Sequence, residues 1–297
     1  MISGNIPSHL LVAARTGFLT TAQPAVPAYA PIASVINMDA KSVDLVDIGG
    51  APMPLRNRGR QQNQDFIEKK LTVTPLDWDI TVFISHNAVK DDQTGELDRK
   101  VRSAGDNFQR HIAQQAFQAL NDGDGTNFGT CYDGLNMFSN SHVDKGAYYT
   151  TVQDNLDAST LSLANLPAIM TKAMKTRDDQ GNFTQYNYDT LIVSPDLHLV
   201  ANQITAVKGG SDDTTKANPY AGNLKYIVAP QFDSTAWVLV ASNENIKPII
   251  IAIREQPNLQ SAWFDPVAPD GGRYYFKFYA RYNHFYGDWR TAYMGNS

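Results

Sequence analysis

The sequence predicts an α+β fold built around one long helix. Residues 95–121 place apolar side chains at three- and four-residue steps, as an amphipathic helix does. Stretches on both sides of this segment alternate apolar and polar residues, as half-buried strands do. Of the 297 residues, 42% are hydrophobic and 19% charged, which is typical of a globular chain. We therefore expect one or two domains that share the long helix.

Charge and cysteine content narrow the class of protein. The chain has 30 acidic and 25 basic residues, a net charge of -5, and no basic run that could neutralise a row of phosphates. Tight nucleic-acid binding is therefore disfavoured. The single Cys131 cannot form an intramolecular disulfide, which fits a reducing compartment. Because we find neither the basic start of a signal peptide nor about 18 uninterrupted apolar residues, we expect no leader and no membrane contact.

Residues 1–42 are expected to form an N-terminal arm. Pro24, Pro27 and Pro31 oppose any long helix there, so the arm should be extended. Such a segment cannot bury enough surface alone, so it should lie against the body or against a neighbouring subunit.

Residues 43–90 are expected to form a β-rich excursion, with strands at 43–48, 66–73 and 80–84. Arg56, Arg58 and Arg60 stand at every second position within it, so in an extended segment they would point to one side. One interpretation is a solvated loop. The other is docking onto an acidic patch of an adjacent subunit, which suits arginine because it makes forked bonds to carboxylates.

Three segments complete the chain. Residues 91–157 hold the long helix and a glycine-rich loop region, and residues 158–245 hold a helix near 159–176, a buried strand at 188–193 and a short helix that starts at Ser194 and Pro195. An exposed polar loop at 208–223 precedes strands at 224–228 and 236–241. Residues 246–297 hold strands at 246–253 and 274–286. Because the last of these has aromatics on both faces, we expect it to be buried on one side and to contact a partner on the other.

Motifs for catalysis, metals or cofactors are weak. The cluster from Ser139 to His142 lacks a nucleophile elbow, and Cys131 lacks a flanking motif, so structural roles are favoured over a hydrolase site. The loop that starts at Asp122 resembles a calcium hand at its first positions, but Asn127 stands where glycine is required, so a helix-ending turn is favoured. No phosphate-binding glycine motif occurs. We therefore expect no catalytic residue, no metal and no cofactor.

Several short stretches, in their order along the chain, resemble the major capsid protein of tailed phages with the fold named for phage Hong Kong 97, and more narrowly the Mu-like prophage major head subunit family. They are the following: Lys69–Pro75, Ile84–His86, Asp91–Asp92, Gly134–His142, Leu191–Leu197, Asn218–Tyr220 with Gly222, Val228–Ser234 and Trp237–Ala241. The resemblance covers most of residues 66–290, and the arm before residue 40 matches nothing in it.

The resemblance implies an N-terminal arm, an extended β-hairpin loop, a long spine helix, and axial and peripheral domains. It also implies a protein of the virion, made in the host cytoplasm, that assembles with itself into hexamers and pentamers of an icosahedral shell around double-stranded DNA. Asn218, Pro219 and Tyr220 join the three arginines as candidate contacts between subunits. Portal, scaffold and decoration proteins are further candidate partners, and contact with the packaged DNA should be loose and non-specific.

Three rival interpretations stay open. An encapsulin-type compartment would share this fold but enclose enzymes. A β-rich hydrolase would use His142 or Cys131, and a tail or baseplate protein would form rings or tubes.

Overall fold

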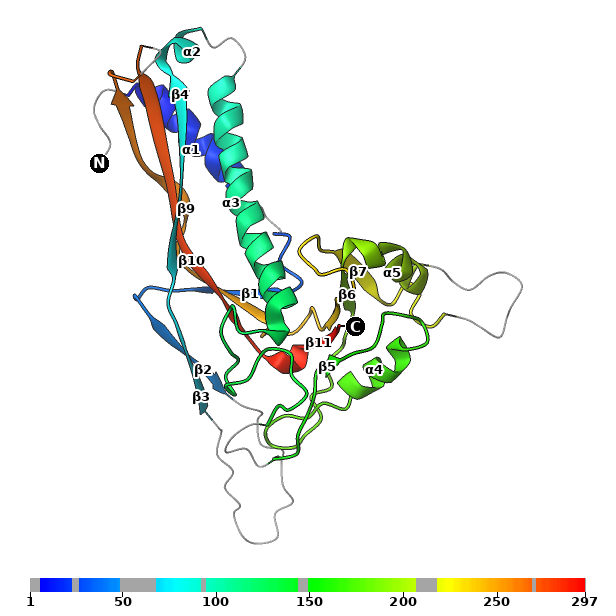
Figure 1. Cartoon of the computed structure of the whole chain (residues 1–297). Coiled ribbons are helices and arrows are strands. Elements are labelled where there is room, and N and C mark those ends of the chain that lie inside the picture. Colours follow the sequence, from blue (N-terminus) through cyan, green and yellow to red (C-terminus); the bar gives the residue numbers. More distant parts are fainter. Residues whose placement is uncertain are drawn as a thin grey trace.

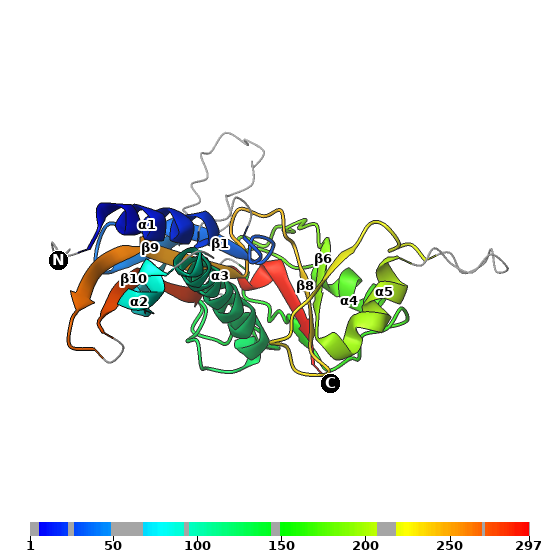
Figure 2. The same cartoon turned by 90° about the horizontal axis from the view of Figure 1, so that it is seen from above.

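The computed structural model describes residues 6–22, 27–48, 68–91, 95–143, 149–206, 218–268 and 271–296. Figure 1 shows a long lobe, made of a twisted sheet and helix α3, beside a smaller lobe that carries α4 and α5. Each lobe has its own hydrophobic core. Figure 2 shows α1 and the lobe of α4 and α5 at opposite ends of the molecule.

A four-stranded sheet forms the long lobe. Its order is β1 (Ala33–Asn37), β9 (Ile249–Asp265), β10 (Arg273–Tyr286) and β4 (Leu76–Ser85). Burial alternates residue by residue along the whole of β10, so its even-numbered side chains form the core and its odd-numbered ones face outward. The strand predicted at 274–286 is confirmed. Strand β9 is longer than the predicted 246–253, and β1 was not predicted.

Helix α3 (Glu96–Asn121) confirms the long helix predicted from its apolar period. It follows Gly95, whose left-handed φ of 69° suits glycine. The helix ends in a 3-10 turn at Asp122–Asp124 and packs along the core face of the sheet (Figure 1).

The prediction that the arm holds no long helix was wrong. Residues Ser8–Ala22 form the 15-residue helix α1, which packs against α3 and β9. The three prolines lie beyond its last residue, and Leu10, Ala14 and Phe18 recur at four-residue steps and are buried. Proline opposes a helix only where it stands inside it, so these prolines allow a helix that ends before them.

Strands β2 (Val43–Ile48) and β3 (Glu68–Val73) form a two-stranded antiparallel ribbon. They lie where the sequence predicted strands at 43–48 and 66–73. Pro75 separates β3 from β4, and β4 starts at Leu76, before the strand predicted at 80–84. Ser85 caps the short helix α2 (His86–Lys90) by accepting a hydrogen bond from the backbone N–H of Ala88. Figure 1 shows the ribbon at the far end of the sheet from α2.

The smaller lobe holds a five-stranded sheet. Its order is β5 (Leu156–Asp157), β11 (Ala292–Gly295), β8 (Trp237–Val240), β6 (Thr190–Val193) and β7 (Lys225–Val228). Helices α4 (Leu166–Ala173) and α5 (His198–Thr205) and the 3-10 turns Pro195–Leu197 and Trp289–Thr291 complete the elements. Strands β6, β7 and β8 and helix α5 lie where strands and a helix were predicted, α4 is shorter than 159–176, and β5 and β11 were not predicted.

Candidate assembly surfaces

Polar contacts from β10 hold the core face of the long sheet against α3. The Tyr282 hydroxyl lies 2.7 Å from His111 Nδ1, and His284 Nε2 lies 3.0 Å from the carbonyl oxygen of Ile112. Near the end of the helix, the Tyr286 hydroxyl donates to the carbonyl oxygen of Ala119 at 3.0 Å. These contacts are spread over about two turns of α3, so helix and sheet form one rigid unit with its opposite face turned outward.

The outward face carries a group of aromatic side chains near α2. Trp263 stacks on Tyr275 with ring centroids 5.1 Å apart, and the Arg273 guanidinium lies 4.9 Å from the centre of the Phe83 ring. Trp263 is 36% and Phe83 48% exposed. Because tryptophan, tyrosine and arginine are enriched where proteins meet, these four residues form a candidate contact surface.

Ion pairs continue this face along β4 and β10. Arg281 Nε lies 2.6 Å from Asp77, and Lys277 Nζ lies 2.9 Å from Asp79. Both aspartates are about half exposed, so each pair contributes little to stability on its own. Together the pairs give this face both positive and negative groups, which can bind opposite charges on a partner.

The β2–β3 ribbon has its own cross-strand contacts. Asp44 pairs with Lys70 at 2.8 Å and accepts a hydrogen bond from the Thr72 hydroxyl at 2.6 Å. The hydrogen bond from Lys70 is the main reason that the pKa of Asp44 is lowered. Cross-strand pairs of this kind fix the register of the ribbon.

The candidate contact residues of the smaller lobe hold the chain beside α5. Asn218 Nδ2 donates to the carbonyl oxygen of Ile204 at 2.6 Å, and its side-chain oxygen accepts from the backbone N–H of Tyr220 at 3.0 Å. Tyr220 is half-buried against the core of this lobe and Pro219 is exposed. Asn218 and Tyr220 thus have contacts within the subunit, and their role between subunits stays a prediction.

Arg56, Arg58 and Arg60 lie outside the described residues. Their predicted docking onto an acidic patch of a neighbour therefore stays a prediction. Asp77 and Asp79 on the outward face of β4, with 60% and 53% of their side-chain surface exposed, are acidic groups of the required kind.

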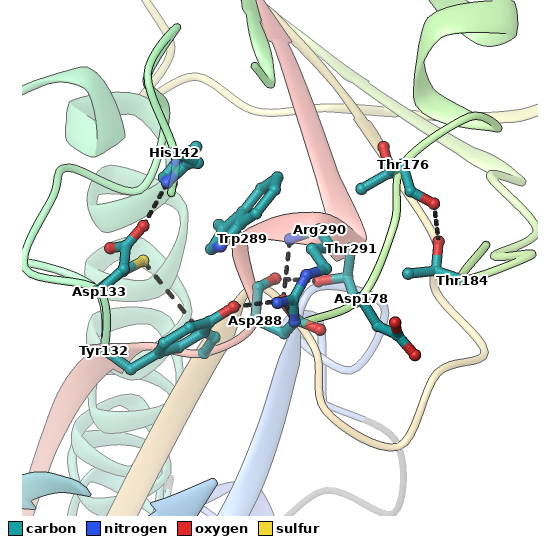
Figure 3. Close-up of polar contacts among 12 residues, drawn as sticks. Tyr132, Asp133, His142, Thr176, Asp178, Thr184, Asp288, Trp289, Arg290 and Thr291 are labelled. Carbon is teal, nitrogen blue, oxygen red and sulfur yellow. Dashed lines mark hydrogen bonds and ion pairs between the residues drawn. The ribbon is translucent and has the colours of Figure 1, made fainter. Parts of the chain in front are cut away.

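A buried polar cluster lies where the two lobes meet, and Figure 3 shows part of it. His142 Nδ1 lies 2.6 Å from Asp133, with both side chains fully buried, and the His142 ring stacks on Trp289 at 4.1 Å. On its other side, His142 Nε2 faces Asn155 Oδ1 at 3.1 Å. Asn155 donates to the carbonyl oxygens of Met137, Trp289 and Ala292, which fixes its amide orientation. His142 Nε2 is therefore the donor to Asn155.

Asp288 is the second centre of this cluster (Figure 3). It accepts hydrogen bonds from the hydroxyls of Tyr132 and Tyr186, at 3.4 and 3.1 Å, and lies 3.5 Å from Arg290. Burial and the charge of Asp288 raise the pKa of Tyr186, so that hydroxyl stays protonated and donates. Tyr132 follows α3 in the long lobe, and Tyr186 precedes β6 in the smaller lobe. The Asp288 carboxylate, just after β10, therefore connects the two lobes by hydrogen bonds. Nothing in the sequence marks this cluster, because its members are far apart along the chain.

The same geometry bears on the hydrolase alternative. Cys131 is buried, and burial raises the pKa of its thiol well above the ordinary value, so it is poorly suited as a nucleophile. Both ring nitrogens of His142 are occupied by Asp133 and Asn155, and the Ser139 hydroxyl bonds to that of Ser141 at 3.1 Å. The residues proposed for a hydrolase thus have structural contacts in place of catalytic ones.

Among the described residues, no group of three or more histidine, cysteine or acidic side chains is arranged to hold a metal ion. Asp122 of the calcium-like loop instead lies 3.4 Å from Asn127 Nδ2. Within the same parts of the chain, no helix combines the length and apolarity that crossing a membrane requires.

Comparison with known proteins gives one family. A model of phage capsid proteins matches residues 68–294, which is most of the chain. None of the curated proteins is similar in sequence at a significant level.

Several solved structures have the same fold. The procapsid protein of bacteriophage JBD30 is 17% identical with a TM-score of 0.56, over 100% of this chain and 76% of that one. The capsid protein of Ralstonia phage GP4 is 11% identical with a TM-score of 0.56, over 93% and 94% of the two chains. A virus-like particle from Pyrococcus furiosus is 10% identical with a TM-score of 0.52, over 95% and 97%. At such identities these likenesses establish the fold alone.

Proposed function

Because this chain belongs to the phage capsid protein family and has the Hong Kong 97-type fold of major capsid proteins, we propose that copies of it form the hexamers and pentamers of an icosahedral shell. The observation that carries this proposal is the family match over residues 68–294, which includes α3 and most of both sheets. The chain is a major capsid protein of the tailed-phage type, a structural component of the virion. Its closer resemblance to Mu-like head subunits stays a prediction.

The shape of the subunit supports assembly. The long sheet and the ribbon have unpaired edges in the described part of the chain, and the outward face offers aromatic and charged groups. Many modest contacts of this kind, multiplied by copy number, give a shell its strength. In this proposal the segments act as follows: arm, 1–42; extended β-hairpin loop, 43–90; spine helix and first part of the peripheral domain, 91–157; axial domain, 158–245; C-terminal peripheral strands, 246–297.

The cargo in this proposal is double-stranded DNA, held by loose and non-specific contact. A net charge of -5 supports this, because an inner wall that bound phosphate tightly would impede packing and release. Portal, scaffold and decoration proteins are proposed as further partners. Before assembly the subunit would be in the host cytoplasm.

Negative-stain electron microscopy of the purified protein tests the proposal. We expect closed shells at high protein concentration. A compact monomer at every concentration would contradict the proposed assembly.

Deletion of residues 51–64 tests the role of the segment between β2 and β3. The variant should fold and stay soluble but no longer close into particles, because this segment is proposed to reach a neighbouring subunit. Circular dichroism and thermal unfolding of the unassembled variant are the controls for its fold. Full-size shells from the variant would show that this assignment is wrong.

A compartment shell is the second candidate, and the fold likeness to the Pyrococcus furiosus particle is the observation in its favour. The phage capsid family match favours the first candidate. The contents of particles made in their native host distinguish the two. Nucleic acid indicates a phage head, whereas a co-purifying enzyme indicates a compartment.

We assign the chain no catalytic role, in line with a family of structural proteins. The occupied ring nitrogens of His142 and the raised pKa of Cys131 support this assignment. Turnover of an ester or peptide substrate by purified protein, lost on substitution of either residue, would contradict it.

A further inference from the structure

Helix α1 carries an inference about the N-terminal arm, and this inference rests on the proposed assembly. The buried apolar side chains of the helix form one stripe, which packs into the core of the same subunit. The members of the stripe are Leu10, Ala14, Phe18 and Ala22. The exposed positions of α1 are small or polar apart from Val12. A helix with one apolar face has no second such face to offer to another subunit.

Phe18 of this stripe lies between α3 and the long sheet. It is fully buried, and its ring stacks on Phe278 of β10 with the ring centroids 4.0 Å apart. Phe108 of α3 meets the same ring edge to face, with the centroids 5.7 Å apart. Release of α1 would therefore leave a cavity in the core of the subunit, which is costly.

The contact between α1 and α3 is close along the length of α1. Ile6, which precedes the helix, is buried in the same core. A methyl group on Gly17 would lie 2.8 Å from Asp98 Oδ1 of α3. Side chains and backbone thus meet from Ile6 to Ala22, and the whole helix is part of the folded subunit.

The chain after α1 is anchored on the same subunit. Tyr29 and Ile32 are buried in the core of the long lobe, and Lys247 Nζ donates to the carbonyl oxygen of Ala30. Strand β1 then pairs with β9. Only residues 23–26 separate this anchored stretch from α1. A connection this short limits how far α1 can extend towards a neighbouring subunit.

We propose that α1 stays docked on its own subunit in the assembled shell, where it holds α3 against the sheet. The first part of the arm then acts within the subunit and is not exchanged between neighbours. Because the core of the mature subunit needs α1, proteolytic trimming of the N-terminus is limited to the residues before Ile6. Contacts between neighbours come from other surfaces of the subunit.

A covalent link between α1 and α3 tests whether α1 stays in place during assembly. The Thr21 hydroxyl reaches the backbone of Arg102, so cysteines at these two positions can be joined by a short bis-maleimide. Unassembled subunits with Thr21→Cys and Arg102→Cys are linked first and then brought to assembly conditions. We expect linked subunits to form shells in the same yield as the unlinked double variant. Each linked chain should run as a monomer on a denaturing gel.

Two controls accompany the linking experiment. The single variant Thr21→Cys should take up the reagent without forming a link. The native Cys131 should stay unmodified, because it is buried and burial raises the pKa of its thiol. Urea unfolding of the unlinked double variant checks that it folds. A folded double variant that yields no link within the unassembled subunit would overturn the docking of α1.

Phe18→Ala measures how much the core of the unassembled subunit depends on α1. Its melting temperature should fall by about 5–10 °C, because the cavity lies between α3 and the sheet. Val12→Ala is the matched control, since Val12 lies on the same helix and is 65% exposed, and it should change the melting temperature little. Equal melting temperatures for the two variants would contradict the proposed role of α1.

Particles purified from the native host test the limit on trimming. The intact mass of their subunit should include every residue from Ile6 onward. A mature subunit that begins within or after α1 would overturn the inference.

Failure of the inference and failure of the proposed function give different results. Wild-type protein that forms no shells refutes both. Shells from wild-type and unlinked chains, with none from linked chains, show that α1 must leave its site. That result refutes the inference alone.

Discussion

At the scale of single residues, the buried polar contacts between the lobes are the least tolerant part of the molecule. Asp133 and His142 are both fully buried and lie 2.6 Å apart. A buried carboxylate is stable only while it has partners, since it has lost its water. These residues therefore contribute to stability through each other, and the loss of one leaves the other with a single remaining partner, Asn155 for His142 or the backbone N–H of Leu135 for Asp133.

His142→Ala should lower the free energy of unfolding by about 3–5 kcal/mol, because it leaves the buried Asp133 with the backbone N–H of Leu135 but without its histidine partner. Urea unfolding of the unassembled subunit measures the effect. His9→Ala is the matched control, since His9 is exposed, and should change the value by less than about 0.5 kcal/mol. Adding Asp133→Asn to His142→Ala should recover part of the loss. Equal stabilities of the His142 and His9 variants would contradict the role given to this pair.

Acid should destabilise the subunit through His284. Burial beside α3 lowers the pKa of His284 from 6.5 to about 4, so the unfolded chain binds more protons between these two values. The stability that neutral His284 contributes is fully present above pH 6.5 and is lost as the pH falls through about 4. The shift corresponds to about 3 kcal/mol.

Urea unfolding at several pH values between 7.5 and 4 measures this loss. The matched variant is His284→Gln, whose side-chain amide can also donate to the carbonyl oxygen of Ile112 but does not titrate. Its stability should fall less steeply over the same range. Parallel curves for the two proteins would assign the acid sensitivity to other groups.

At the scale of elements, helices α1 and α3 pack closely against each other. The Thr21 hydroxyl donates to the carbonyl oxygen of Arg102 at 3.0 Å, and Gln109 Nε2 donates to that of Ala22 at 2.6 Å. Gly105 lies at the point of contact, where a methyl group would lie 2.7 Å from the carbonyl oxygen of Phe18. The absence of a side chain at Gly105 therefore sets the distance between the two helices.

Gly105→Ala should lower the free energy of unfolding by about 1–3 kcal/mol, because the added methyl forces α1 away from α3. Helix propensity alone predicts the opposite sign, a gain of about 1 kcal/mol. Ser103→Ala is the control, since Ser103 is exposed on the same helix and should leave stability unchanged or slightly higher. Chemical unfolding of both variants decides between packing and propensity. A stabilised Gly105→Ala would show that α1 is not held closely in solution.

The elements with a long, clean period could be predicted from the sequence, as could the four-residue strands β6, β7 and β8, which are runs of mostly apolar residues. Helix α3 and strand β10 alternate over many residues, so their patterns are unambiguous. Strands β5 and β11 have only two and four residues, too few for a period to show. Helix α1 has a four-residue apolar spacing over only 15 residues, and the prolines that follow it obscure that spacing in the sequence.

The candidate contact residues were predicted less completely. Aromatics on both faces of β10 indicated a partner on the outward side, and the structure places Tyr275 there beside Trp263 and Phe83. Only the pairing of β4, β9 and β10 brings these three side chains together, and this pairing cannot be read from a single strand. The same holds for Asp288, whose tyrosine partners are 156 and 102 positions away in the sequence.

At the scale of the whole molecule, the chain forms two hydrophobic cores, one in each lobe. Within the described residues, the helices of the long lobe lie on one face of its sheet, so much of the other face remains available to other molecules. A subunit of this shape gains stability when neighbours cover that surface, since anything that binds only the folded state shifts the folding equilibrium.

Assembled shells should therefore unfold at a higher temperature than unassembled subunits. Scanning calorimetry of both forms in the same buffer measures the difference. The variant that lacks residues 51–64 should unfold at the temperature of unassembled wild-type subunits. If shells and subunits unfold together, contacts between subunits do not contribute measurably to stability.

Strand β11 also has a consequence for the order in which the polypeptide is made. It pairs with β5 on one side and β8 on the other, so residues 292–295 lie between these two strands in the sheet. During translation the strands at 156–157 and 237–240 emerge long before the strand that joins them. In a nascent chain, the edge of β8 that pairs with β11 therefore stays without its partner until residue 295 has been synthesised. A chaperone that covers this edge would be needed only until then.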